Sequence, residues 1–288
     1  MSPSAKDRLA GLPFAVAAFA AAGIVLLIAA FLLRESQIAL GNVQLARFIS
    51  DPGWHPTPRA SDGAFNLAPM VLSTLLSTLG AMLIAAPLGL LSAVFRHDYA
   101  PRPLAAVYQR MIELLAGIPS VVYGLWGLVT LAPLIRLLAP PGPSLLAAIL
   151  ILTLMVLPTV ALFADAAIAA VPHAHRQAAA ALGLSRARTV WCVVVPAARG
   201  GIYGGVCLAA GRALGETMAV LMVSGNVVQV PGSLLDPVRT LTANIALEMA
   251  YAMHDHRSAL FVSGLLLALV VSALVFSAHR AAGGRLHA

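Results

Sequence analysis

Six long apolar runs alternate with short polar segments along this chain of 288 residues. A hydrocarbon core about 30 Å thick is crossed by roughly 20 apolar residues in an α-helix, and each run reaches or approaches that length. Spanning segments must satisfy their own backbone hydrogen bonds, and the alternation of a barrel strand is missing, so we expect helices. The pattern therefore predicts an all-α membrane protein with six transmembrane helices, at 12–33, 67–95, 112–131, 145–163, 200–223 and 260–278.

The polar segments between these runs predict the loops. Residues 35–66 are expected to form an outer loop near the membrane surface, where Trp54 would lie at headgroup depth as an interfacial anchor. Residues 96–110, which contain two prolines, predict a turn, and a long loop is expected at 225–256. We therefore divide the chain into an N-terminal helix and outer loop (1–66), a helical core (67–280) and a tail (281–288).

The segment 172–196 is the polar stretch with the clearest internal pattern. Good helix formers at 178–182 follow Pro172, which suits the first turn of a helix. Gly183 would end that helix, because glycine accepts the left-handed conformation of a helix end. A second helical piece is expected from 185 to 195, leading to Pro196.

The composition fits a membrane location and gives an orientation. Hydrophobic residues make up 60% of the chain and charged residues 10%, which is too apolar for a soluble domain of this size. With the N-terminus inside, eleven basic residues fall on the cytoplasmic side, namely Lys6, Arg8, Arg96, Arg102, Arg110, Arg176, Arg186, Arg188, Arg199, Arg280 and Arg285. Six fall outside, namely Arg34, Arg47, Arg59, Arg136, Arg239 and Arg257. This bias predicts that both termini and the 172–196 loop are cytoplasmic. The net charge of +7 then reflects topology, and the scattered arginines argue against nucleic-acid binding.

Catalytic and metal-binding motifs find little support. A P-loop needs a lysine after its glycine-rich turn, and the chain's one lysine, Lys6, precedes the first span. No hydrolase motif is present. The pairs His173/His175 and His254/His256 lack further ligands at metal-site spacing, so we expect solvated loop residues and no metal.

Four stretches of sequence resemble a known family. Residues 177–196 fit the pattern E-A-A-x3-G-x9-I-x-L-P of the coupling loop in bacterial ABC importer permeases, with Gln177, Val193 and Val195 as departures. Residues 112–127, 155–159 and 211–220 are similar to the phosphate-importer permease of PstC type. Gly-Arg-Ala-Leu-Gly-Glu-Thr-Met-Ala-Val at 211–220 holds the most specific of these matches.

This resemblance implies an architecture, a function and a set of partners. The fold would be the type I (MetI-like) importer core with one helix added in front, in the bacterial inner membrane. The partners would be a PstA-type permease in a heterodimer, two copies of an ABC ATPase that carries ATP and Mg, and an outer phosphate-binding protein. The coupling residues would be Gln177, Ala178, Ala179, Gly183 and Pro196. Two alternatives stay open: a permease for sulfate, molybdate or tungstate, and a membrane sensor or scaffold that reports phosphate to a sensor kinase.

Three acidic and basic residues are candidates for the substrate pathway. Arg212 and Glu216 are four apart, which places them on one face of the fifth helix. An ionised side chain at membrane depth costs at least about 2.5–3.5 kcal/mol, so such residues mark a pathway by default; a structural ion pair is the alternative. Glu113, near the start of the third span, either contributes to transport or lies at the interface in water.

Two sets of small residues have structural consequences. Gly117, Pro119 and Ser120 interrupt the third span, where a proline removes a backbone hydrogen bond; this is either a gate or hinge, or a tolerated kink. Glycine pairs at spacing four in 200–215 allow close helix packing, which predicts that the fifth helix packs into the core.

Overall fold

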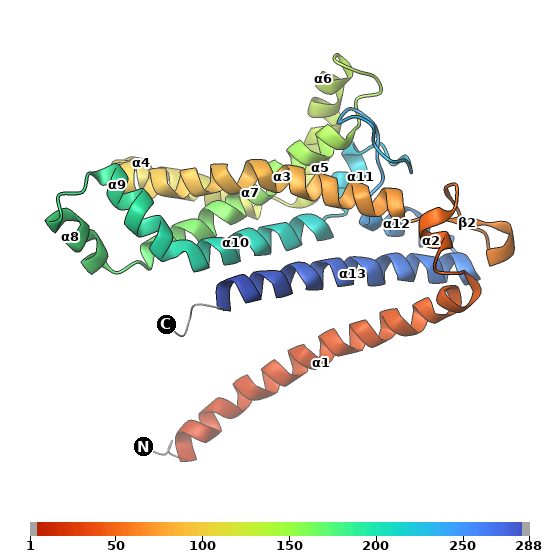
Figure 1. The fold of residues 1–288 in the computed structure, drawn as a ribbon, viewed down its shortest axis with the longest axis horizontal. Coiled ribbons are helices and arrows are strands. Elements are labelled where there is room, and N and C mark those ends of the chain that lie inside the picture. Colours follow the sequence, from red (N-terminus) through yellow and green to blue (C-terminus); the bar gives the residue numbers. More distant parts are fainter. Residues whose placement is uncertain (1–4, 284–288) are drawn as a thin grey trace.

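The computed structural model describes residues 5–283, and the side chains of residues 12–277 (Figure 1). The chain starts with α1 (Ala5–Asn42), α2 (Arg47–Ser50), β1 (Trp54–His55), the 3₁₀ turn η1 (Ala60–Asp62) and β2 (Ala64–Phe65). Next come α3 (Ala68–Val94), the π-helical turn η2 (Phe95–Tyr99), α4 (Arg102–Gly117), α5 (Ser120–Trp126), the π-helical turn η3 (Gly127–Leu131), α6 (Ala132–Arg136) and α7 (Leu145–Ala169). The last part holds α8 (His173–Ala181), α9 (Arg186–Thr189), the π-helical turn η4 (Val190–Val194), α10 (Val195–Gly215), α11 (Met218–Val223), α12 (Leu241–Glu248) and α13 (His254–Gly283).

The helices confirm an all-α membrane architecture. In the described chain, five helices are long and apolar enough to cross a membrane: Leu12–Asn42, Ala68–Tyr99, Leu145–Ala169, Arg186–Gly215 and His254–Ser277. A sixth span is made by Arg102–Gly117 and Ser120–Arg136, which bend by 91° at the break between them. The expected number of six is thus reached only when this broken pair is counted as one span.

Two segments that we expected to be a turn and a loop, 96–110 and 35–66, consist largely of helices and short strands. The segment 96–110 continues α3 as η2 and then begins α4 at Arg102, because Pro103 lies in the first turn of that helix, where a missing N–H is harmless. The segment 35–66 lengthens the first helix to Asn42 and then forms α2 and the antiparallel pair β1–β2. The division into 1–66, 67–280 and 281–288 stays a prediction, and residues 284–288 of the tail lie outside the described residues. The side chains of Lys6, Arg8, Arg280 and Arg285 lie outside them as well.

The α7 helix forms the centre of the bundle. It packs against α3 on one side and α10 on another, and 67% of the residues in its most apolar 18-residue stretch are buried. Small residues permit this approach: a Cβ added at Gly80 of α3 would lie 2.7 Å from Ile149, and one at Gly201 would lie 2.6 Å from Ala167. The expectation that glycines in 200–215 pack the fifth helix into the core is therefore confirmed at Gly201 and at Gly205, which faces Phe163.

The two ends of the molecule differ in structure. Figure 1 shows α8 and α9 at one end of the long axis, which we call the α8 end, and β1, β2 and α2 at the other, the sheet end. At the sheet end α1 is joined to α13 by ring contact between Phe31 and Phe261 (5.6 Å between centroids) and by the Ala39 amide, which donates to Ser258 Oγ (2.9 Å). Toward the α8 end α1 diverges from α13.

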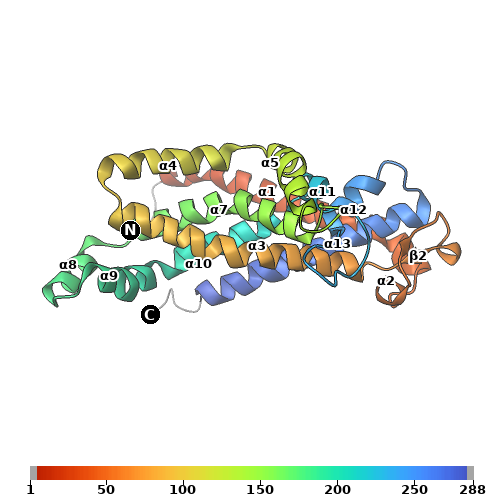
Figure 2. The ribbon, with the colours of Figure 1, turned by 90° about the horizontal axis from the view of Figure 1, so that it is seen from above.

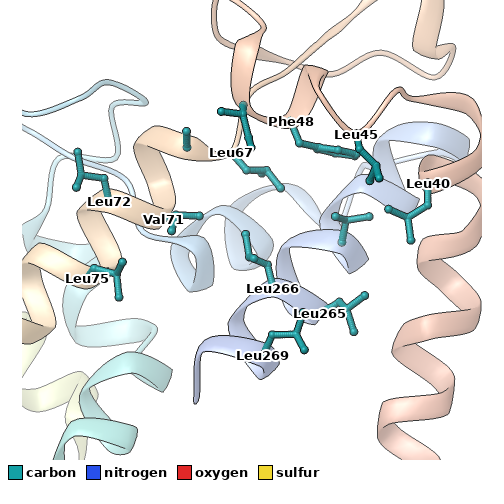
Figure 3. A pocket seen from close by; sticks show the side chains of 13 residues that line it. Leu40, Leu45, Phe48, Leu67, Val71, Leu72, Leu75, Leu265, Leu266 and Leu269 are labelled. Atoms are coloured by element: carbon teal, nitrogen blue, oxygen red, sulfur yellow. The ribbon is translucent and has the colours of Figure 1, made fainter. Parts of the chain in front are cut away.

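An apolar groove of about 520 Å³ lies between α1, α3 and α13 near the sheet end (Figure 3). Its thirteen lining residues are all apolar, and Leu40, Phe48 and Leu266 are among those that point into it. Because an oxyanion requires hydrogen-bond donors or positive charge, this groove is unsuited to carry one. The polar candidates lie elsewhere in the fold.

Candidate substrate pathway and coupling surface

Two broken helices meet on one side of α7. The first break separates α4 from α5 at Ile118 and Pro119, and the second separates α10 from α11 at Glu216 and Thr217. The short helices that follow the breaks pack together closely, since a Cβ at Gly124 of α5 would lie 2.8 Å from the Cα of Ala219 in α11. Irregular backbone at membrane depth is tolerated only inside protein or beside water, so this meeting point is where a polar path is expected.

The first break forms where the sequence placed it. Gly117 ends α4, Pro119 caps α5 in an extended conformation, and Ser120 is the first residue of α5. The carbonyl of Leu115 accepts from the amide of Ile118 (3.3 Å) and also from Tyr123 Oη (2.8 Å), since Pro119 has no N–H to supply the usual helical bond. The expected interruption is confirmed as a sharp bend; its role as a gate stays a prediction.

The second break changes the interpretation of Glu216. The helix ends at Gly215, and Glu216 adopts an extended conformation (φ −68°, ψ 129°), so Arg212 and Glu216 do not share a helical face as expected. Its Oε1 accepts from the amide of Ala219 (3.0 Å), and its backbone carbonyl accepts from Thr242 Oγ1 (2.8 Å). The carboxylate therefore caps the start of α11, where exposed N–H groups favour negative charge. An ion pair between Arg212 and Glu216 is not among those of the described residues.

Arg212 lies in the last turn of α10, about 25 Å along the helix from Val195 at 1.5 Å per residue. Its Nη1 donates to Thr159 Oγ1 of α7 (3.2 Å), and the residue is exposed in the single chain. Within the described part of the chain, Arg212 has no carboxylate partner. A guanidinium carries five N–H donors, so most of its binding capacity is open to a ligand.

Glu113 lies apart from this meeting point. It is exposed on α4, one turn before Gly117, and accepts from Gln109 Nε2 (2.7 Å) on its own helix. Gln109 in turn accepts from Arg96 of η2. These bonds connect Glu113 to the α8 end of the molecule, and its role in a substrate pathway stays a prediction.

The 172–196 segment forms the two helical pieces that the sequence predicts. Pro172 caps α8, and Gly183 adopts a left-handed conformation (φ +72°) after its last turn. The amide of Gly183 donates to Ala180 O (2.9 Å) and that of Leu184 donates to Ala179 O (3.1 Å), which closes the helix end in the way glycine permits.

The same segment presents an exposed surface. Among the coupling candidates Ala179 is buried, whereas Gln177, Ala178, Gly183 and Pro196 are exposed. Leu182, between the two helical pieces, is 79% exposed.

A buried polar cluster at the sheet end was missed by the sequence analysis. Glu248 accepts from Trp54 Nε1 (2.8 Å) and from Arg239 Nη1 (2.6 Å), and lies 2.9 Å from Nε2 of His256. Trp54 and His256 are buried, so the expectations of an interfacial tryptophan and of a solvated His256 are wrong. The reason is the same for both: partners distant in the chain satisfy their polar atoms and allow burial. His173, His175 and His254 are exposed as expected.

Metal-binding geometry is not found within residues 5–283, where no group of three His, Cys, Asp or Glu side chains is placed to hold an ion. What the described residues offer is a positive charge at Arg212 and an exposed surface at α8 and α9.

Comparison with known proteins identifies the family. The profile described as "Binding-protein-dependent transport system inner membrane component" matches residues 85–287. A phosphate transport system permease protein PstC of Mesorhizobium japonicum is 36% identical over 255 residues, covering 81% of this chain and 76% of that protein. A probable ABC transporter permease protein YqgH of Bacillus subtilis is 38% identical over 239 residues, covering 82% of this chain and 76% of that protein.

Solved structures agree with this fold. The inward-facing MetNI methionine ABC transporter aligns with a TM-score of 0.58 at 18% identity, covering 76% of this chain and 93% of that one. A bacterial ABC transporter for import of the polysaccharide alginate aligns with the same TM-score at 14% identity, covering 76% and 79%. The chain therefore belongs to the family of binding-protein-dependent transport system inner membrane components, and it is of the PstC permease type.

Proposed function

We propose that this chain is the permease subunit through which inorganic phosphate crosses the bacterial inner membrane, in an importer driven by ATP and supplied by a binding protein. The observation that carries the proposal is Arg212, a guanidinium without a carboxylate partner in the described chain, near the place where two broken helices meet. Its planar fork can contact two oxygens of a phosphate at once. The phosphate transport function of the PstC relatives supports the same substrate.

The path would run along the meeting point of α5 and α11. Phosphate would enter between this permease and a second one, for which a PstA-type partner in a heterodimer is our expectation. Glu216 would keep α11 in place through its cap, while Arg212 attracts the anion. The break after Gly117 lets the two halves of that span move separately, which is what a gate requires.

Energy would come from a separate subunit. The chain's one lysine lies at position 6, outside any glycine-rich turn, so ATP and Mg would be held by two copies of a partner ATPase. The exposed α8 and α9 would lie in a groove of that ATPase, with Gln177, Gly183 and Pro196 in the contact region. Closure of the ATPase dimer would then move the helices, and this chain would carry out no catalysis.

We also propose the orientation given by the arginine bias, with both termini and the α8 end in the cytoplasm. The sheet end would then face an extracytoplasmic phosphate-binding protein. In Figure 1, α1 begins and α13 ends toward the α8 side of the molecule, which agrees with one side for both termini. Fusion of a reporter that is fluorescent only in the cytoplasm to either terminus tests this orientation.

Uptake of labelled phosphate tests the substrate. Cells that lack the gene are supplied with it together with its partner subunits, and sulfate and molybdate are added as competitors. We expect restored uptake that neither competitor inhibits. Uptake of molybdate or sulfate in place of phosphate would instead support a permease for another oxyanion. If cells with and without the gene take up phosphate equally but differ in phosphate-dependent gene expression, the sensor alternative would be supported.

A further inference from the structure

The turn η2 lies between the coupling segment and the broken span. It follows α3 directly and precedes α4, which packs against α7 and runs from the region of α8 and α9 toward α5 (Figure 2). Side chains of this one turn contact four helices outside it: α4, α7, α8 and α9.

Two contacts join η2 to the coupling segment. Arg176 of α8 forms an ion pair with Asp98, whose side chain is 6% exposed. The guanidinium of Arg186 in α9 lies over the ring of Tyr99, 5.2 Å from its centroid. Both helical pieces of the exposed loop are therefore attached to the same turn, one by charge and one by a cation–π contact.

Further contacts join η2 to α4 and α7. Arg96 forms an ion pair with Asp165 of α7 and also donates to Gln109 of α4. The ring of Phe95 lies edge-on against Tyr108 of α4, with 5.8 Å between centroids. From these contacts α4, a helix of 16 residues, runs to the bend at Gly117 and so connects η2 to the break.

The ion pair to α8 joins a buried Asp98 to an Arg176 side chain that is 24% exposed, through one hydrogen bond. Oδ2 of Asp98 and Nη2 of Arg176 are both buried, and neither has a hydrogen-bond partner among the described residues. Removal of Arg176 leaves the charge of Asp98 buried and unpaired, which is strongly unfavourable. A pair held by one bond can rotate while its charges stay in contact, so it can follow a moving helix without breaking.

We propose that η2 is the relay that passes motion of the coupling helix α8 to the broken span α4–α5, with Asp98 and Arg176 as the positioning residues of this link. The proposal rests on the proposed function of α8 as the ATPase-docking helix. It adds the route inside this chain: α8 to Asp98, then Arg96 and Phe95 to α4, and α4 to the bend at Gly117.

The test measures coupling rather than activity alone. The complete importer, with its ATPase and binding protein, is reconstituted in proteoliposomes, and phosphate transported per ATP hydrolysed is measured for wild type, Asp98→Ala and Arg176→Ala. We expect the ratio to fall about fivefold or more, since couplings between sites are typically 5–150-fold. The double variant should lose no more than either single variant, because both remove the same link. Arg176→Lys, which keeps the charge, should retain most of the ratio.

A second readout is independent of the substrate. In a chain with Cys192 and Cys207 replaced by alanine, Val121→Cys reports on the first turn of α5 through its rate of reaction with a water-soluble thiol reagent. We expect this rate to change on ATP binding in the wild-type background and to stay constant with Asp98→Ala. If the wild type shows the ATP-dependent change, Asp98→Ala abolishes it and no phosphate is moved, the substrate proposal fails while the relay is upheld.

A matched control removes an ion pair at the other end of the molecule. Asp51→Ala breaks the pair with Arg47 (3.1 Å) near the sheet, where side-chain exposure is similarly low, and should leave the coupling ratio unchanged. Should Asp98→Ala fail to assemble, Asp98→Asn takes its place under the same criterion. The relay is overturned if the Asp98 variant transports as much phosphate per ATP as the wild type and also shows the same ATP-dependent change in labelling of Val121→Cys.

Discussion

Replacement of Arg212 tests the proposed pathway most directly. The structure uses one of the five guanidinium donors, in the bond from Nη1 to Thr159 Oγ1. The remaining donors, and a positive charge without a carboxylate partner in the described chain, are what a passing phosphate would meet. Arg212→Lys keeps the charge but replaces the planar fork with a single point contact, whereas Arg212→Gln removes the charge.

The size of the effect follows from the hydrogen bonds at stake. A hydrogen bond to a charged group is worth about 1.5–3 kcal/mol, and each 1.36 kcal/mol corresponds to a factor of ten in rate. Loss of one of two bonds in Arg212→Lys should therefore lower the maximal uptake rate about 10–150-fold. Arg212→Gln should lower it further. Thr159→Val removes only the positioning bond, which is long (3.2 Å) and exposed to solvent, so the uptake rate should fall less, by about 2–10-fold.

The assay is the initial rate of labelled phosphate uptake at saturating external phosphate, normalised to the amount of each variant in the membrane. The maximal rate is the informative quantity, because the half-saturating phosphate concentration would be set by capture on the separate binding protein. If Arg212→Gln takes up phosphate at the wild-type rate and level of protein, the guanidinium is not on the pathway and the argument from membrane charge is refuted.

Three further predictions concern packing, the coupling loop and the buried cluster. Gly124→Leu forces a side chain against the α11 backbone, so the free energy of unfolding in detergent should fall by about 1–3 kcal/mol. An unchanged unfolding temperature would contradict the packing of α5 on α11. Gly183→Ala places an L-residue at φ +72° in open space, which costs about 1–2 kcal/mol of backbone strain. The affinity for the partner ATPase should fall about 5–30-fold, and Gly183→Asn should be milder. Trp54→Phe removes the bond to Glu248 and should destabilise the protein by about 1.5–3 kcal/mol, whereas the exposed Trp191→Phe should have no effect.

The sequence predicts features that are set by local chemistry. Apolar runs gave the spans because bilayer thickness fixes their length, and Gly183 and Pro119 marked a helix end and a break because their backbones allow few alternatives. The short helix at Gln177 was predicted because its neighbours at 178–182 are good helix formers and follow Pro172. These features need no knowledge of distant parts of the chain.

Features that depend on distant partners were not predicted. Glu216 follows a helix of regular spacing, and only its bonds to Ala219 and to Thr242 show that the helix has ended. Trp54 is buried because Glu248, 194 residues away, accepts its N–H. Patterns along a sequence carry no information about which distant acceptor a polar side chain will meet.

The glycines of α10 have a consequence for what keeps this helix intact. Six of its residues are glycine, which in water would weaken a helix by about 5 kcal/mol relative to six alanines. In hydrocarbon the backbone has no water to bond with, so the helix persists regardless of propensity. The helical state of α10 therefore depends on its apolar surroundings, both α7 and hydrocarbon, rather than on its own residues. Beside the polar groups of Glu216 and Thr217, little in the sequence of α10 resists unwinding, and the helix ends at Gly215.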